Sequence, residues 1–380
     1  MLEGYLFHGQ SLLPSLQELT TGTTGRGGIG NFSSKNDYWV ISKLTASGHY
    51  GGTSGFANGR IVGCEFTGRS GITPLGAGAL IDAGANFAIS FGVNTIDNLK
   101  VFGNYLHDFG TPASNNNLLH TMYFRIRSNT RTLRAPEIGW NYLHDKDGPR
   151  FGIHYYDEGS DVDGEPDVGT FIDVMRIHDN VVRDQTGPGI NIGTLTSGTN
   201  NANFNVEIYN NLLIDCGRDR VLTGTNVHAF QIYGARMTGH FSIYNNTIYG
   251  FGEPENGTGY ALYIPKTASL GIKSEFGGSF ELKNNIFVDT NNLEFIDFNN
   301  LALPSTSTNN IWYSSYGHQP PSFEINPIIS NPMFVNAASF DFNIRENSPG
   351  RNSGADTSSV LTTDILGVVR NIFDIGAFEY

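Results

Sequence analysis

Alternating apolar and polar positions recur along the chain in short blocks that end in asparagine. The clearest block is V-E-I-Y-N-N at residues 206–211, and it returns as F-S-I-Y-N-N from Phe241 and F-E-L-K-N-N from Phe280. Period-2 alternation rich in Val, Ile, Phe and Tyr is typical of β-strands. The last asparagine of successive blocks recurs every 31 to 39 residues, at positions 104, 141, 180, 211, 246 and 285. This recurrence predicts a repeat architecture.

The asparagines indicate how such strands stack. Asparagine tolerates the left-handed conformation that a sharp turn requires, and its side chain bonds to nearby backbone. When turns stack, one asparagine lies over the next, and the amides can satisfy one another as a ladder. No long helical stretch separates the blocks, which disfavours alternating strands and helices. We therefore predict an all-β chain folded as a parallel β-helix, a solenoid with several strands in each coil.

The two ends of the chain differ from the column of coils. Residues 1–34 are polar and rich in glycine, and we expect an irregular lead-in or partial cap there. Residues 35–335 carry the strand blocks and are predicted to form the parallel β-helix. Beyond residue 310 the spacing shortens and prolines become frequent. We interpret residues 336–380 as a C-terminal closing segment of the same single domain.

The tail carries three phrases: S-P-G-R-N-S-G-A-D from Ser348, D-I-L-G-V-V-R from Asp364 and D-I-G-A-F-E-Y from Asp374. Together with the asparagine-punctuated coils, they resemble the closing segment of secreted bacterial β-helix proteins of the pectate-lyase-like superfamily. The resemblance implies a right-handed parallel β-helix and the binding or cleavage of a polysaccharide. It does not identify a family within the superfamily, because one fold hosts many activities and the polygalacturonase, pectate-lyase and alginate-epimerase signatures are absent.

The charge and composition of the chain indicate which classes of molecule it can bind. The formal net charge is −13 and the isoelectric point is about 5.1, whereas nucleic-acid binders usually carry a basic stripe. We expect no nucleic-acid partner and no organic cofactor. An anionic polysaccharide can still bind through a local basic groove or a bound cation. No apolar run reaches 18 residues, so we expect no membrane span.

The cysteines and the N-terminus are the parts of the sequence that relate to the cellular location of the protein. Cys64 and Cys216 each follow a strand block, and we predict that both are buried free thiols. The N-terminus has no basic region followed by a sustained apolar run, so it does not predict a signal peptide. The resemblance implies an extracellular protein, either secreted or virion-associated. The open ends of a lone β-helix can pair with other chains, so monomer and homotrimer are both compatible with the sequence.

A second column of strands follows the asparagine blocks. Alternate side chains of a strand face opposite ways, so the apolar member of each pair should point inwards. Coils lie about 4.8 Å apart, and the outward side chains would therefore tile a ribbon roughly 20 Å long, enough for several sugar rings. We align residues 122–127, 151–156, 189–192, 230–233 and 261–264. The outward set is Tyr123, Arg125, Arg127, His154, Tyr156, Asn191, Gln231, Tyr233, Tyr263 and, just beyond its strand, Lys266.

This set suits β-elimination from a uronate polymer. That reaction needs a neutralised carboxylate, a base for the α-proton and an acid for the leaving oxygen. Arg125 or Arg127 can neutralise the carboxylate, His154 or Lys266 can act as the base, and Tyr156 as the acid. The predicted substrate-binding residues are Tyr123, Asn191, Gln231, Tyr233, Tyr263, Arg220 and His228. A glycan-binding face without chemistry, and an ordinary solvated face, are alternatives for the same residues.

An acidic run lies directly after Tyr156. Six carboxylates fall within residues 157–167, and oxygens at this spacing can wrap a hard cation such as Ca²⁺. The predicted ligands are Asp157, Glu158, Asp161, Asp163, Glu165 and Asp167. A solvated acidic loop explains the run equally well.

Hydrolysis competes with elimination for the same region. A glycosidase needs two carboxyls about 5–5.5 Å apart for retention or about 6.5–9.5 Å apart for inversion. Asp157 with Glu158, or either of them with Asp184 or Asp219 from neighbouring coils, could form such a pair. The sequence therefore predicts a polysaccharide lyase first, a β-helix glycoside hydrolase second, and a non-catalytic glycan-binding spike or adhesin third.

Overall fold

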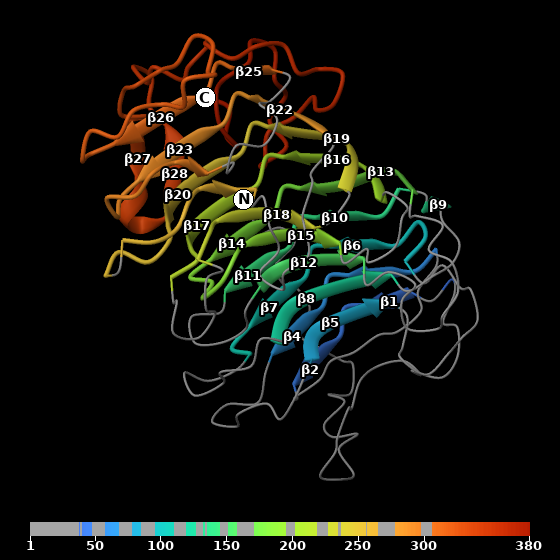
Figure 1. The fold of residues 1–380 in the computed structure, drawn as a ribbon. Helices are drawn as coiled ribbons and strands as arrows, with labels where there is room; N and C mark the ends of the chain where they lie inside the picture. Colours follow the sequence, from blue (N-terminus) through green and yellow to red (C-terminus); the bar gives the residue numbers. More distant parts are fainter. Residues whose placement is uncertain are drawn as a thin grey trace.

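The chain is an all-β solenoid in which parallel strands stack coil upon coil, as the computed structural model shows (Figure 1). The predicted parallel β-helix is confirmed. The structure describes residues 38, 40–47, 58–67, 78–84, 96–109, 119–126, 132–133, 135–144, 151–157, 171–194, 202–218, 227–234, 237–255, 257–264, 278–297 and 306–380. The lead-in expected at residues 1–34 lies outside this part of the chain.

Three sheets of parallel strands form the sides of the solenoid. The first sheet contains β1 (Val40–Ser42), β3 (Arg60–Val62), β6 (Lys100–Phe102), β10 (Glu137–Gly139), β13 (Phe171–His178), β16 (Ala202–Tyr209), β19 (Met237–Tyr244), β22 (Ser279–Lys283) and β25 (Thr306–Thr308), with β9 (Thr132–Leu133) paired to β13. The second contains β2 (Thr45–Ser47), β4 (Glu65–Thr67), β7 (Tyr105–His107), β11 (Tyr142–His144), β14 (Val181–Arg183), β17 (Leu212–Cys216), β20 (Thr247–Phe251), β23 (Ile286–Asp289) and β26 (Ile311–Ser314). The third contains β5 (Gly78–Gly84), β8 (Leu119–Ile126), β12 (Phe151–Asp157), β15 (Ile190–Thr194), β18 (Phe230–Gly234), β21 (Leu262–Tyr263) and β24 (Ile296–Asp297).

Strict alternation in these strands builds one narrow core. Ile177, Ile208 and Ile243 pair in register on the first sheet, and each is at most 2 % exposed. Because buried residues from all three sheets belong to one cluster, the core is continuous along the axis. Cys64 and Cys216 lie in this core as buried free thiols, as predicted.

A ladder of asparagine side chains runs along the corner between the first and second sheets. In each rung, Nδ2 of one asparagine donates to Oδ1 of the asparagine one coil further on; the distance is 3.0 Å both from Asn180 to Asn211 and from Asn211 to Asn246. The same acceptor oxygen also receives the preceding asparagine's backbone N–H. Since an amide carries both donors and acceptors, a stacked column satisfies itself. Glu324 ends the ladder by accepting from Asn310 Nδ2 at 3.0 Å.

The residue before each ladder asparagine makes the turn. Asn210, Asn245 and Asn284 have φ values of 53°, 52° and 58°, which is the left-handed region. The two asparagines of each N-N pair therefore have different roles. The first provides the left-handed turn, and the second provides the buried rung.

The C-terminal segment lies along the side of the solenoid, against the outer face of the second sheet. Strands β27 (Phe334–Asn336) and β28 (Asp341–Ile344) flank the 3₁₀ helix η2 (Ala337–Ser339) and form a short antiparallel ribbon beside β20 and β23 (Figure 1). Outward residues of the second sheet pack with the segment in a buried apolar cluster: Val181, Leu212 and Ile214 with Phe342, Ile365, Ala377 and Phe378.

The turn asparagines also anchor this segment. Asn210 Nδ2 donates to the Thr363 carbonyl at 2.8 Å, and Asn284 Nδ2 donates to the Ala355 carbonyl at 2.8 Å. Arg370, whose side chain is fully buried, donates to Glu379 Oε2 at 2.8 Å and to Asn210 Oδ1 at 3.1 Å. The motif arginine of the tail thus joins the segment to the corner of the solenoid.

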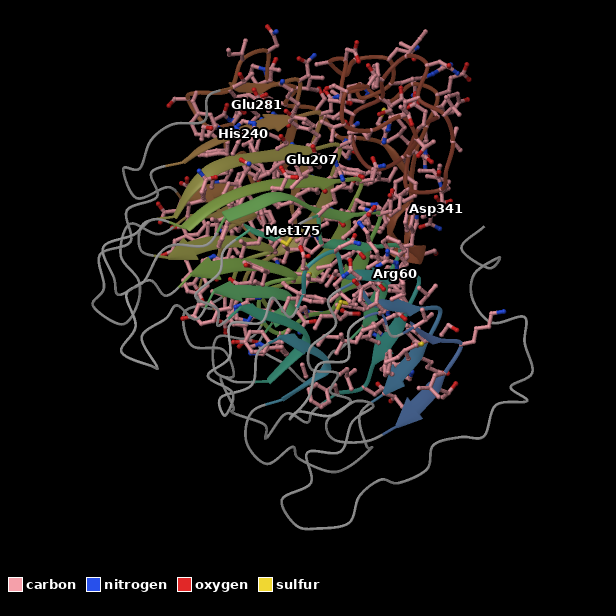
Figure 2. All side chains as sticks on the ribbon, turned by 90° about the vertical axis from the view of Figure 1, so that its right-hand side faces the viewer. Arg60, Met175, Glu207, His240, Glu281 and Asp341 are labelled. Atoms are coloured by element: carbon pink, nitrogen blue, oxygen red, sulfur yellow. The ribbon has the colours of Figure 1, made fainter. Side chains whose placement is uncertain are left out.

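The outer face of the first sheet carries a row of mostly charged side chains. Arg60, Glu207 and Glu281 belong to one register row across it, whereas Met175 is a buried side chain of the same sheet (Figure 2). Lys100 Nζ lies 2.7 Å from Glu137 Oε2, and Arg176 Nε lies 2.7 Å from Glu207 Oε2. Within the described residues, no helix is long and apolar enough to span a membrane.

Candidate functional site

One register row of polar and aromatic residues crosses the outer face of the third sheet. Tyr123 pairs with His154, His154 with Asn191, Asn191 with Gln231, and Gln231 with Tyr263. The row continues from Tyr263 to Asp297 on β24. The structure thus places outward residues from the five aligned segments in one register row. Asp297 extends the row by one coil.

A second row lies two residues further along the same strands. Tyr156 pairs with Arg125 on one side and with Gly193 on the other, and Gly193 pairs with Tyr233. The rings of Tyr156 and Tyr233 stack across the intervening strand, with centroids 6.0 Å apart. A Cβ on Gly193 would lie 2.5 Å from the Tyr233 ring, so the absence of a side chain makes room for that ring.

His154 lies inside an aromatic cluster. Its ring centroid is 4.4 Å from Phe151, 4.6 Å from His120 and 5.0 Å from Tyr123. The centroid of the Tyr156 ring lies 5.5 Å from that of His154. His154 and Gln231 are each 4 % exposed and Asn191 is fully buried, whereas Tyr123, Tyr156, Tyr233 and Tyr263 are half-buried. The tyrosines, together with Asp297 at the end of the first row, thus present surface to solvent.

Asn191 lies at the centre of the first row, between His154 and Gln231. Among the described residues, neither its Oδ1 nor its Nδ2 has a hydrogen-bond partner. An unpaired buried amide costs on the order of 1–3 kcal/mol, and such costs concentrate at functional sites.

Several predicted residues lie outside the described part of the chain. Arg125 and Asp157 are placed by their backbones on β8 and β12, and their side chains are not described. Those outside entirely are Arg127, Glu158, Asp161, Asp163, Glu165, Asp167, Arg220 and Lys266. No cluster of three or more His, Cys, Asp or Glu residues suited to a metal ion occurs among the described residues. The calcium site at residues 157–167 stays a prediction.

Asp184, a candidate for a hydrolytic pair, is surrounded by two arginines and a histidine. Its carboxylate lies 2.7 Å from Arg218 Nη1, 3.1 Å from Arg183 Nε and 3.2 Å from His144 Nε2. A carboxylate held by two guanidinium groups has an evident structural role as an ion-pair centre. Its predicted partner Asp219 lies outside the described residues.

A pocket of about 330 Å³ lies at the far end of the first row. It contains His228 and Tyr263, which the sequence predicted, and groups that the sequence did not single out. Its described lining is Val227, His228, Gly257, Thr258, Gly259, Tyr260, Tyr263, Asn292, Leu293, Glu294, Asp297 and His318. The volume is at the small end of the roughly 300–1,000 Å³ range of ligand sites.

Two tight turns shape the pocket. Asp289, which is 1 % exposed, accepts the backbone N–H of Asn291 at 2.8 Å and that of Leu293 at 3.1 Å. This turn presents Glu294. On the other wall, Gly259 has a φ of +128°, and a Cβ there would lie 2.2 Å from the Val227 carbonyl oxygen. Only glycine fits this close approach of two backbones.

Three nearly parallel rings form one side of the pocket. Tyr263 stacks on His228 with centroids 3.9 Å apart and an interplanar angle of 18°. Tyr260 lies 5.7 Å from Tyr263 at 7°. His228 is 3 % exposed, while both tyrosines are half-buried, so the tyrosine rings are the accessible part of this platform.

Two carboxylates give the pocket a negative potential. Asp297 accepts a hydrogen bond from the Tyr260 hydroxyl, and Glu294 is exposed beside it. Burial, the charges of Asp297 and Glu294, and this hydrogen bond together raise the pKa of Tyr260 above its ordinary value. Tyr260 therefore stays a neutral hydrogen-bond donor, and the pocket offers strong acceptors to a ligand.

No protein-family model matches this chain, and no curated protein matches it.

Proposed function

We propose that this chain is a polysaccharide-active enzyme that binds a glycan along the outer face of the third sheet. We propose further that it is a lyase, which cleaves a uronate-containing glycan by β-elimination at β8 and β12. The aromatic side chains of the face suit sugar rings, because a sugar presents CH groups that pack against the negative face of an aromatic ring.

The observation that carries the proposal is the proximity of His154, Tyr156 and Arg125. His154 and Tyr156 are on one strand, with ring centroids 5.5 Å apart, and Arg125 pairs with Tyr156 from the neighbouring coil. A base, an acid and a cation are the three groups that elimination requires. They come from two adjacent strands of a rigid sheet.

In the proposed reaction, Arg125 neutralises the uronate carboxylate, which acidifies the hydrogen on the adjacent carbon. His154 accepts that proton, and the electrons of the broken C–H bond form a carbon–carbon double bond. The bond from the next ring carbon to the glycosidic oxygen breaks at the same time. Tyr156 gives its proton to the leaving oxygen, so the products are an unsaturated uronate and a new chain end. Calcium bound by residues 157–167 would add to the positive charge of Arg125.

Hydrolysis in the pocket is a second candidate, which one observation favours. Glu294 is exposed and Asp297 is half-buried, so both carboxylates reach solvent, whereas His154 is only 4 % exposed. Two accessible carboxylates are the groups that a glycosidase uses.

The test is to incubate the protein with a panel of uronate-containing polysaccharides, with calcium or with a chelator. Absorbance near 235 nm and the release of reducing ends are followed together. Elimination is expected to raise both signals. Reducing ends without a rise in absorbance would replace the lyase proposal with hydrolysis, and the absence of both signals would leave glycan binding without chemistry.

Substitutions test whether Tyr156 and His154 are the acid and the base of the proposed reaction. Tyr156→Phe and His154→Gln should each lower the elimination rate at least about 100-fold, which is the usual contribution of an acid or base. Tyr380→Phe, at an exposed tyrosine in the tail, is the matched control and should retain full activity. Unchanged rates in both test variants would remove this face from the mechanism.

A further inference from the structure

The pocket at the end of the first row has a chemistry opposite to that of the proposed lyase site. The lyase site is built around Arg125, which attracts a carboxylate. Glu294 and Asp297 face the pocket, and its described lining contains no Lys or Arg. A uronate placed there would lie beside two like charges, and their repulsion would disfavour its binding.

The pocket nevertheless has the features of a sugar site. The rings of Tyr260 and Tyr263 are nearly parallel, and together they offer an apolar platform beside acceptor groups. Glu294, Asp297 and Asn292 provide oxygens that accept hydrogen bonds from hydroxyl or ammonium groups. His318 Nε2 lies 3.1 Å from Asn292 Oδ1, which orients that amide at the rim.

We infer that this pocket binds a sugar ring that carries no carboxylate. The inference extends the proposed function and partly rests on it. If elimination occurs beside His154, the substrate is a heteropolysaccharide that contains a non-acidic sugar about three strands away from the reacting uronate. Three inter-strand spacings between β12 and β21 amount to roughly 14 Å.

The experiment measures binding to the full chain by calorimetry. The probes are short oligosaccharides of neutral hexoses, of unacetylated hexosamines and of uronates. The expected result is binding of the neutral or the amino sugar with at least about tenfold preference over the uronate. The comparison between the first two probes shows whether the carboxylates recognise hydroxyl or ammonium groups. Binding of the uronate alone, or no binding of any probe, would overturn the inference.

Charge-removing variants locate the site. Glu294→Gln and Asp297→Asn should each shift the preference towards uronates by roughly fivefold, because each removes one like charge. Glu346→Gln removes an exposed carboxylate in the tail, outside the pocket, and is the matched control with no expected shift. An equal shift in the control would show a general effect of net charge and would contradict the assignment to the pocket.

The pocket inference and the lyase proposal fail separately. His154→Gln should abolish elimination and leave the binding of short non-acidic sugars unchanged. If it abolishes both, the two regions are one site, and the separate pocket is disproved. If Glu294→Gln and Asp297→Asn leave the sugar preference unchanged while elimination is intact, the inference fails and the proposed function stands.

Discussion

The outer faces of the second and third sheets arise from the same alternation of inward and outward side chains. One face is covered by the C-terminal segment, whereas the other, among the residues that the structure describes, is not packed against it. On the second sheet, the outward positions Val181, Leu212 and Ile214 are apolar and pack against the C-terminal segment. On the third, the outward positions are tyrosine, histidine and amide side chains that end at a pocket. Alternation therefore determines which side chains point outwards. Whether those side chains are apolar or polar then determines whether the C-terminal segment packs against them.

The difference shows how a solenoid separates stability from recognition. The second sheet gains apolar burial from the C-terminal segment, and the corner beside it gains hydrogen bonds, including the bond from Arg370 to Asn210. The third sheet keeps half-buried tyrosines and an Asn191 amide that has no hydrogen-bond partner within the described part of the chain, and these groups contribute little to folding. Substitutions on the two faces should therefore separate into losses of stability and losses of binding.

The largest effect is expected from Arg370→Met. Removing the guanidinium leaves Glu379 without its ion-pair partner in a buried setting, and one-sided removal of a buried pair costs about 3–5 kcal/mol. The measurement is the free energy of unfolding from urea titration. Arg345→Met, at an exposed arginine of the same segment, is the control and should cost less than about 1 kcal/mol. A loss of under 1 kcal/mol for Arg370→Met would show that the tail is not held by this residue.

The next prediction compares an aromatic residue from each face. Phe378→Ala empties part of the buried cluster on the second sheet and should cost about 3 kcal/mol of unfolding free energy. Tyr263→Ala removes a half-buried ring from the third sheet and should cost clearly less, while weakening sugar binding in the pocket. Thermal unfolding and calorimetric titration of both variants test this. Similar losses of stability, with sugar binding intact in both, would contradict the division between the two faces.

The repeating features of the molecule could be predicted from the sequence. The asparagines mark the corner of each coil, and period-2 alternation then fixes which of His154, Asn191 and Gln231 share a row. Such contacts join corresponding positions in neighbouring coils, so they are visible as a repeat. The ladder was confirmed for this reason, and the outward residues His154, Asn191 and Gln231 of the aligned segments lie in one row.

The pocket and the course of the tail could not be predicted in the same way. The hydrogen bond from Arg370 to Asn210 joins residues 160 positions apart, and no period reveals it. The turn that presents Glu294 depends on the buried acceptor Asp289, a local arrangement outside the strand column. Asp297 could have been predicted from the sequence, because Phe295-Ile296-Asp297 repeats the strand pattern one coil beyond Tyr263, where the predicted column of strands ended. The burial of His154 depends on its aromatic surroundings, which strand alternation does not specify.

A smaller effect is expected from pH, at the corner that joins the first sheet to the tail. His178 is 2 % exposed and bonds Asp179 at 2.7 Å and Glu137 at 2.9 Å, while the rings of Tyr209, Trp140 and Phe102 pack around it. Burial acts to lower the pKa of His178, but the hydrogen bonds to Asp179 and Glu137 outweigh it and raise the pKa. A raised pKa means that the stabilisation is complete below about pH 6.5 and is lost as pH rises through the folded value.

Glu137 makes the stability contributed by the same corner depend on pH in the acid range as well. Its hydrogen bond with His178 is the main cause that lowers the pKa of Glu137 to about 2. The stabilisation is therefore present above about pH 4.5 and is lost as pH falls towards 2. Unfolding free energies measured from pH 3 to 9 should decline on both sides, and His178→Gln should remove the alkaline decline. If the unfolding free energy of His178→Gln still declines at alkaline pH as in the unmodified protein, a group other than His178 causes that decline.

The smallest loss of stability is expected from Gly193→Ala on the third sheet. The new methyl group would meet the Tyr233 ring, which can rotate away, so the cost should stay within about 1 kcal/mol. Displacing that ring breaks its stack with Tyr156 and should weaken the binding of long glycans, measured by calorimetry. Gly152→Ala is the matched comparison, because its methyl group would lie 2.6 Å from the Gly189 carbonyl oxygen, which is backbone and cannot rotate away. Gly152→Ala should therefore lower stability more than Gly193→Ala. If both variants lose stability equally and bind glycan normally, the Tyr156–Tyr233 stack is not part of the binding face.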